Sequence, residues 1–74
     1  MIFSNAKDLG DIIRAVRKSQ GMTQAKLAGA SGTGVRFIVD LEKGKPTSEV
    51  EKVLLVISML GIKLEANLPE DINE

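Results

Sequence analysis

Three segments with apolar residues at helical spacing and a shorter segment after the first, each followed by a glycine, constrain the fold of this 74-residue chain more than any other feature. In the first segment the apolar residues recur at i, i+3, i+4 and i+7, and they are Leu9, Ile12, Ile13 and Val16. This spacing predicts an amphipathic helix over about residues 5–19, with Ser4 or Asn5 as its N-cap and Gly21 after its end. The first segment therefore indicates an α-helical domain.

The second segment is shorter. Thr23 is expected to cap a helix that turns Leu27 and Ala28 toward the core. The run Gly-Ala-Ser-Gly-Thr-Gly at residues 29–34 is expected to break this helix and to form a turn.

Helical spacing returns in the third segment, where the apolar residues are Val35, Ile38 and Leu41. A third helix is therefore predicted from residue 35 to about residue 43, and the sequence Gly44-Lys45-Pro46 ends it. A short helix, a glycine-containing break and another short helix describe a helix-turn-helix.

Thr47 or Ser48 is expected to cap a fourth helix that extends to Leu60, with Glu49 and Glu51 in its first turn. Its expected core stripe consists of Val50, Val53, Leu54, Ile57 and Leu60. Additional apolar surface is supplied by Leu55, Val56 and Met59. A helix that is apolar on more than one face must be buried on more than one face, and a domain this small cannot enclose it alone. A contact between two copies is expected here, with a crowded single core as the alternative.

The residues after Gly61 change to a period of two. Apolar residues 62, 64, 66 and 68 alternate with polar ones, which predicts a half-buried strand ended by Pro69. Because the chain has no second strand pattern, the same strand of a second copy is the expected pairing partner, antiparallel across a two-fold axis. The alternative is an irregular tail lying on the fourth helix. The expected dimer contacts are Leu55, Val56, Met59, Ile62, Leu64 and Ala66.

The expected fold class is therefore all-α, with four or five helices and one short C-terminal strand that pairs across a homodimer. Residues 1–68 are expected to form a single domain, and residues 69–74 a disordered tail.

Composition narrows the function. The chain has no Cys and no His, which removes thiolate nucleophiles, sulfur metal sites and the side chain that titrates near neutral pH. An enzyme is therefore not expected, and neither a metal nor a cofactor is implied. The longest apolar run is five residues, far short of the roughly 20 that span a bilayer, so a cytoplasmic protein without a membrane contact is expected.

The charge is unevenly distributed although the net charge is zero. Residues 1–46 carry eight Lys and Arg against four Asp and Glu, a net charge of +4, whereas residues 47–74 carry two against six, a net charge of −4. This asymmetry favours a basic face for a polyanion and an acidic end that stays in water or meets a basic partner.

An ordered set of residues resembles the DNA-binding domains of the Cro and phage-repressor (XRE) family. The set covers about residues 9–61 and consists of Thr23-Gln24-Ala25-Lys26-Leu27-Ala28, Gly32, Ile38, Leu41-Glu42, Gly44, Pro46 and Leu60-Gly61. The resemblance implies a sequence-specific repressor that binds double-stranded DNA as a homodimer. The chain departs from the family where Ser31 and Thr33 replace aliphatic residues around Gly32, and where Gly34 replaces a Ser or Thr N-cap.

The segment Gly61-Ile62-Lys63-Leu64-Glu65-Ala66 adds a narrower resemblance to HipB-type antitoxins. That resemblance implies strand pairing across a dimer, repression of the protein's own operon and binding to a HipA-like kinase toxin. The alternative is an autonomous XRE-family repressor without a toxin partner.

The third helix is expected to enter the major groove, where base edges are read by placed donors, acceptors and methyl contacts. Val35 can touch a thymine methyl group and Arg36 can form a two-pronged contact with guanine. Asp40 can accept from cytosine or can pair within the helix, and Val39 shares the same outward face.

Other residues of the expected DNA-binding set lie around that helix: Thr23, Gln24, Thr33, Lys43 and Lys45. The resemblance implies that Gln24 anchors the DNA backbone, while the two lysines neutralise phosphates without reading sequence. It also implies a structural ion pair between Arg17 and Glu42 that holds the third helix to the first.

Overall fold

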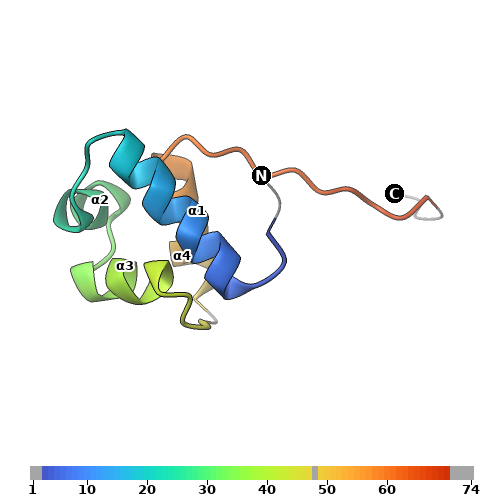
Figure 1. Ribbon diagram of the computed structural model, residues 1–74, viewed down its shortest axis with the longest axis horizontal. Coiled ribbons are helices and arrows are strands. Elements are labelled where there is room, and N and C mark those ends of the chain that lie inside the picture. Colours follow the sequence, from blue (N-terminus) through green and yellow to red (C-terminus); the bar gives the residue numbers. More distant parts are fainter. Residues whose placement is uncertain (1–2, 48, 71–74) are drawn as a thin grey trace.

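Four α-helices follow one another in the computed structural model, which describes residues 3–47 and 49–70. They are α1 (Ala6–Ser19), α2 (Gln24–Ser31), α3 (Val35–Glu42) and α4 (Val50–Met59). Figure 1 shows them gathered into one body from which the C-terminal segment extends. The expected all-α architecture is confirmed. No described helix has the length and apolar character needed to cross a membrane.

The starts of α1 and α2 are held by side-chain caps. The backbone N–H of Asp8 donates to Oδ1 of Asn5 at 2.8 Å, and the N–H of Lys26 donates to Oγ1 of Thr23 at 3.0 Å. Both caps were expected from sequence. The expected break over residues 29–34 begins later, because α2 continues through Gly29 and ends only at Gly32, which has a left-handed φ of 70°.

The expected start of α4 was too early. The helix begins at Val50, and Glu49 is its N-cap without a side-chain cap bond. Oγ1 of Thr47 accepts from the N–H of Glu49 at 3.0 Å, so this hydroxyl stabilises a turn before the helix instead of capping it. The other expected cap, Ser48, lies outside the described residues.

The core combines residues from all four helices, namely Ile13, Leu27, Ala28, Ile38, Leu41, Val56 and Ile57, with Leu60 at the end of α4. Val56 is completely buried, so its assignment to the dimer surface was wrong. The face of α4 that packs inward is 53, 56, 57 and 60, again at i, i+3, i+4 and i+7. The predicted stripe was rotated, and Val50 and Leu54 are exposed.

Gly10 lets α1 approach α3 closely. A Cβ atom at this position would clash with the carbonyl oxygen of Leu41 and would lie 2.8 Å from that of Glu42. The last turn of α3 therefore packs directly against the α1 backbone, which fixes the orientation of α3.

The predicted C-terminal strand does not form within the described chain. Ile62 packs partly against the core and its N–H donates to the carbonyl of Ile57 at 3.1 Å, whereas residues 63–70 are exposed and leave the helices in Figure 1. The described residues have no other strand for this segment to pair with, which is the physical reason. Of the expected disordered tail, residues 71–74 lie outside the described part.

Candidate nucleic-acid interface

The turn between α2 and α3 is built by hydrogen bonds where the XRE family has aliphatic residues. Ser31 is buried, and its hydroxyl donates to the carbonyl of Leu27 at 2.8 Å and lies 2.9 Å from Oγ1 of Thr33. The N–H of Thr33 donates to the carbonyl of Ala28 at 3.0 Å. These bonds close the turn that leads from α2 to α3.

The first turn of α3 presents Val35 and Arg36 to solvent. Ile38 and Leu41 point into the core and fix the opposite face of the helix. The Arg36 side chain is 77% exposed, and about half of the surface of Val35 is accessible. Val39, further along, is half-buried. An arginine and an apolar side chain are therefore displayed together at the start of a helix.

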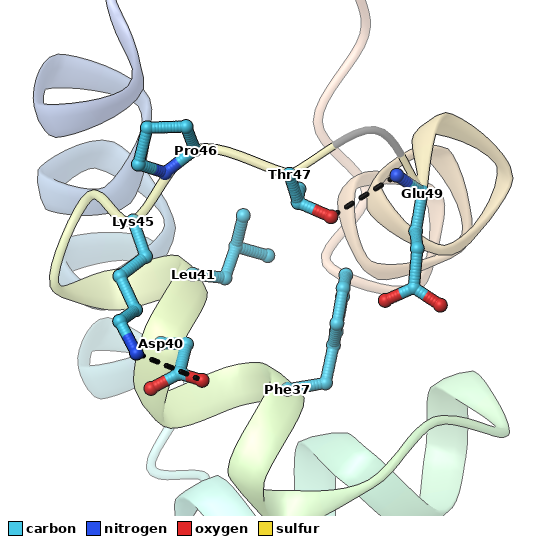
Figure 2. A pocket seen from close by; sticks show the side chains of 7 residues that line it. All are labelled: Phe37, Asp40, Leu41, Lys45, Pro46, Thr47 and Glu49. Atoms are coloured by element: carbon cyan, nitrogen blue, oxygen red, sulfur yellow. Dashed lines mark hydrogen bonds and ion pairs between the residues drawn. The ribbon is translucent and has the colours of Figure 1, made fainter.

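Asp40 is turned toward the flank of α3 rather than straight outward. Its side chain is 27% exposed, with Oδ1 3.4 Å from Nε of Arg36 and Oδ2 3.9 Å from Nζ of Lys45. Figure 2 shows it at a shallow hollow of about 300 Å³ between α3 and the loop to α4. The structure thus brings together Arg36, Asp40 and Lys45, all of which were predicted to contact DNA. Lys43 lies exposed after the end of α3.

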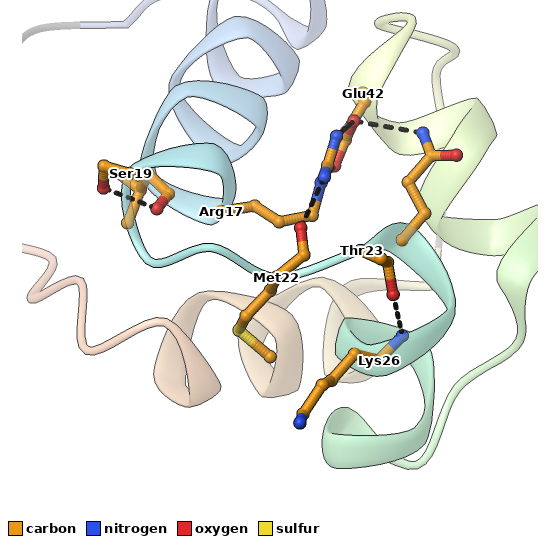
Figure 3. Close-up of polar contacts among 8 residues, drawn as sticks. Arg17, Ser19, Met22, Thr23, Lys26 and Glu42 are labelled. Carbon is orange, nitrogen blue, oxygen red and sulfur yellow. Dashed lines mark hydrogen bonds and ion pairs between the residues drawn. The ribbon is translucent and has the colours of Figure 1, made fainter.

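Arg17 and Glu42, the two residues expected to pair, form a two-pronged ion pair between α1 and α3. Nε of Arg17 donates to Oε2 of Glu42 at 2.6 Å, and Nη2 donates to Oε1 at 3.0 Å. The third nitrogen, Nη1, donates to the carbonyl of Met22 at 2.7 Å (Figure 3). The Arg17 side chain is 9% exposed and the Glu42 side chain 3%. Hydrogen bonds to Glu42 raise the pKa of Arg17 against the opposing effect of burial, so the guanidinium stays charged.

Gln24 joins this ion pair. Its Nε2 donates to Oε1 of Glu42 at 3.2 Å, which connects the first turn of α2 to the last residue of α3. The neighbouring Thr23 uses its hydroxyl as the α2 cap, as Figure 3 also shows. The residues expected to face phosphates at the start of α2 are therefore fixed by bonds inside the protein.

Two structural contacts were not predicted from the sequence. One is the close approach of α1 to α3 at Gly10, which could have been indicated by the presence of a glycine inside an amphipathic helical pattern. The other joins α3 to α4: the Lys52 ammonium lies 5.7 Å from the centroid of the half-buried Phe37 ring. Figure 2 shows Phe37 reaching from α3 toward Glu49. No sequence spacing indicates a contact of this kind.

The described residues contain no group of three or more acidic side chains arranged to hold a metal ion. They display an exposed arginine at the start of α3 and exposed lysines after the end of the same helix, whose opposite face is held by buried contacts. Chemically, this arrangement can bind an anion and donate hydrogen bonds to a base edge.

Comparison with known proteins gives a family match. The family model described as helix-turn-helix matches residues 13–67. A protein of Sinorhizobium fredii (strain NBRC 101917 / NGR234), named as the uncharacterized HTH-type transcriptional regulator y4mF, is 50% identical over 62 residues. The match covers 84% of this chain and 82% of that protein.

Solved structures share the fold. The clp gene regulator ClgR from C. glutamicum is similar with a TM-score of 0.72 and 29% identity, over 80% of this chain and 76% of that one. The restriction-modification controller protein C.AhdI from Aeromonas hydrophila has a TM-score of 0.71 and 24% identity, over 78% of this chain and 84% of that one. The likeness to C.AhdI is one of fold alone.

Proposed function

This chain belongs to the helix-turn-helix family of the Cro and phage-repressor (XRE) type, and we propose that it is a transcriptional repressor that reads a specific DNA sequence through α3. The main support for this proposal is the exposure of Val35 and Arg36 at the start of α3. Arg36 offers a two-pronged contact to guanine O6 and N7, and Val35 offers a methyl contact to thymine. Because Ile38 and Leu41 hold the other face, the pair is displayed at a fixed angle.

Phosphate contacts are proposed for the residues around the groove-facing helix. Lys43 and Lys45 supply charge without sequence preference. Gln24 keeps its amide oxygen and its second amide hydrogen beyond the bond to Glu42, and the hydroxyl proton of Thr23 stays available because that oxygen only accepts in the cap. Val39 is proposed to contact the DNA beside them.

Hydrogen-bond accounting argues against Thr33 as a phosphate donor. The Ser31 hydroxyl lies 2.8 Å from the carbonyl of Leu27 and 2.9 Å from Oγ1 of Thr33, so a Ser31 proton donated to the carbonyl leaves the proton of Thr33 to make the contact between the two hydroxyls. We therefore assign Thr33 to the turn.

A homodimer is proposed to bind a palindromic operator, with the two α3 helices about one helical turn of DNA, roughly 34 Å, apart. Support comes from apolar side chains left exposed on α4 and on the extended segment, namely Leu54, Leu55, Met59, Leu64 and Leu68. Burying them against a second copy removes apolar surface that a small domain cannot cover by itself.

Selection from a random double-stranded DNA library, followed by titration of the enriched sequence, tests the proposal. We expect a palindromic sequence to be enriched. Arg36→Ala should lower affinity for it by about 30-fold or more, since each of the two half-sites loses a two-pronged base contact worth about 1–3 kcal/mol. Arg14→Ala, which removes the same charge from an exposed position on α1, is the matched control and should change affinity less than about 3-fold. No enrichment, or equal losses in the two variants, would contradict the proposal.

The antitoxin role has one supporting observation, the net charge of −4 over residues 47–74. An acidic segment of this kind suits a basic partner surface. The neighbouring gene tests this second function: a kinase-like gene beside it supports an antitoxin, and an isolated gene counts against one. The relative y4mF and the structurally similar ClgR are both named as regulators, which favours the autonomous repressor.

A further inference from the structure

The geometry points to Asp40 as a positioning residue that sets base specificity by holding Arg36, rather than as a residue that reads a base itself. This inference rests on the proposed function and adds a named role to it. It begins with the orientation of the Asp40 carboxylate, which lies along the flank of α3 with a 27% exposed side chain. A base edge that approaches the outer face meets Arg36 before it meets this carboxylate, because the arginine is 77% exposed.

The contact between the two residues leaves the useful part of the guanidinium free. Asp40 faces Nε of Arg36, at 3.4 Å, one helical turn away. A guanidinium carries five N–H donors in a plane, and Nε accounts for one of them. The two terminal nitrogens, Nη1 and Nη2, remain available for guanine O6 and N7. A carboxylate beside Nε therefore restrains the plane of the guanidinium group and leaves Nη1 and Nη2 free.

The Asp40 carboxylate also needs this neighbour. Its Oδ1 is inaccessible to solvent and accepts no hydrogen bond from any described residue. A buried carboxylate oxygen without a donor is costly, and the Arg36 Nε is the cation that the structure places against it. The contact with Arg36 is an ion pair without the geometry of a hydrogen bond. Lys45 approaches the other oxygen, at 3.9 Å, so the carboxylate is held between two cations.

Negative charge beside phosphates has a second consequence. The charge of Asp40 repels the phosphates of every DNA sequence, and the restraint that it places on Arg36 offsets this repulsion only where Arg36 meets a guanine. Asp40 thus lowers the affinity for DNA that lacks this guanine and raises the discrimination at the base pair read by Arg36. A base-reading Asp40 would instead discriminate at its own base pair, independently of Arg36.

Asp40→Asn tests the inference, since it keeps the shape and removes the charge. Discrimination is measured as the ratio of affinities for the selected sequence and for versions changed at single base pairs. We expect Asp40→Asn to reduce this ratio about 2- to 5-fold at the base pair read by Arg36, the range that a surface ion pair supplies. Affinity for unrelated DNA should rise. In an Arg36→Ala background, Asp40→Asn should leave the ratio unchanged.

Asp11→Asn is the matched control, because Asp11 also forms an ion pair one helical turn away, with Lys7 at 2.9 Å, but on α1. Asp11→Asn should not change the discrimination ratio, either in the wild-type protein or in the Arg36→Ala background. Unchanged discrimination in Asp40→Asn, or a loss that persists in the Arg36→Ala background, would overturn the inference while leaving the repressor proposal intact. A wild-type protein that enriches no sequence would instead remove the proposed function, and the inference with it.

A measurement without DNA completes the test. The Nε–H bond vector of Arg36 should become more mobile on the picosecond to nanosecond timescale in Asp40→Asn, as followed by nitrogen-15 relaxation, and should not change in Asp11→Asn. Equal mobility in wild type and Asp40→Asn would show that the carboxylate does not hold the arginine, and would overturn the inference.

Discussion

At the scale of single residues, the ion pair of Arg17 and Glu42 is worth different amounts depending on what replaces it. Its two charges lie out of water, so the attraction between them offsets a large desolvation cost. Removing one partner leaves the other charge buried without compensation. The pair should therefore be sensitive to single substitutions and tolerant of joint replacement.

Glu42→Ala should lower the free energy of unfolding by about 3 kcal/mol, because Arg17 and Gln24 both lose their acceptor. Urea denaturation without DNA measures the loss. Replacing both charges, as Arg17→Met with Glu42→Leu, should cost less than the single change. A loss below about 0.5 kcal/mol for Glu42→Ala would contradict a buried clamp.

The pH dependence of the contribution of Arg17 to stability follows from the direction in which folding shifts its pKa. The folded-state pKa is raised above the unfolded value, so the stabilisation is fully present below the unfolded pKa and is lost only as the pH rises through the folded one. Both values lie far above neutrality. The contribution of Arg17 should therefore be constant between pH 6 and pH 9, and denaturation curves across that interval check it.

At the scale of secondary-structure elements, the close contact of α1 with α3 depends on the missing side chain of Gly10. Gly10→Ala should destabilise the protein by about 2 kcal/mol, although alanine favours a helix by about 1 kcal/mol, because the added Cβ pushes α3 away from α1. Gly29→Ala is the matched control. It lies in α2, a Cβ there meets nothing within 4 Å, and it should stabilise by about 0.5–1 kcal/mol. In thermal unfolding, the Tm of Gly10→Ala should fall below that of the wild type and the Tm of Gly29→Ala should rise above it.

These elements also show what sequence can and cannot predict. The caps Asn5 and Thr23 were predictable, since a cap bond is made within a few residues. The buried face of α4 was not, because apolar residues occur all around that helix and give no single preferred face. The role of Gly10 and the orientation of Asp40 depend on residues distant in sequence or on side-chain direction, which spacing does not encode. The exposed face of α3 was predictable, because Ile38 and Leu41 at helical spacing are the residues that turn inward.

At the scale of the whole molecule, the single chain leaves apolar surface exposed on α4 and on the extended segment. Ile62 packs partly against the core, so a test of the segment must leave it in place. Truncation after Lys63 meets this condition, as does Leu64→Pro, which removes a donor from any ladder shared with a second copy. Leu55→Glu with Met59→Glu tests the α4 part of the surface separately.

We expect each of these changes to lower dimer affinity in analytical ultracentrifugation, and to weaken binding to a palindromic site more than binding to one half-site. The reason is that two linked α3 helices make the second engagement intramolecular, so loss of the link removes the gain in effective concentration. The monomer fold should persist, because the changed side chains are exposed. If truncation after Lys63 leaves the dimer intact while the α4 variant abolishes it, α4 alone forms the interface. The extended segment would then be free to bind a partner of another kind.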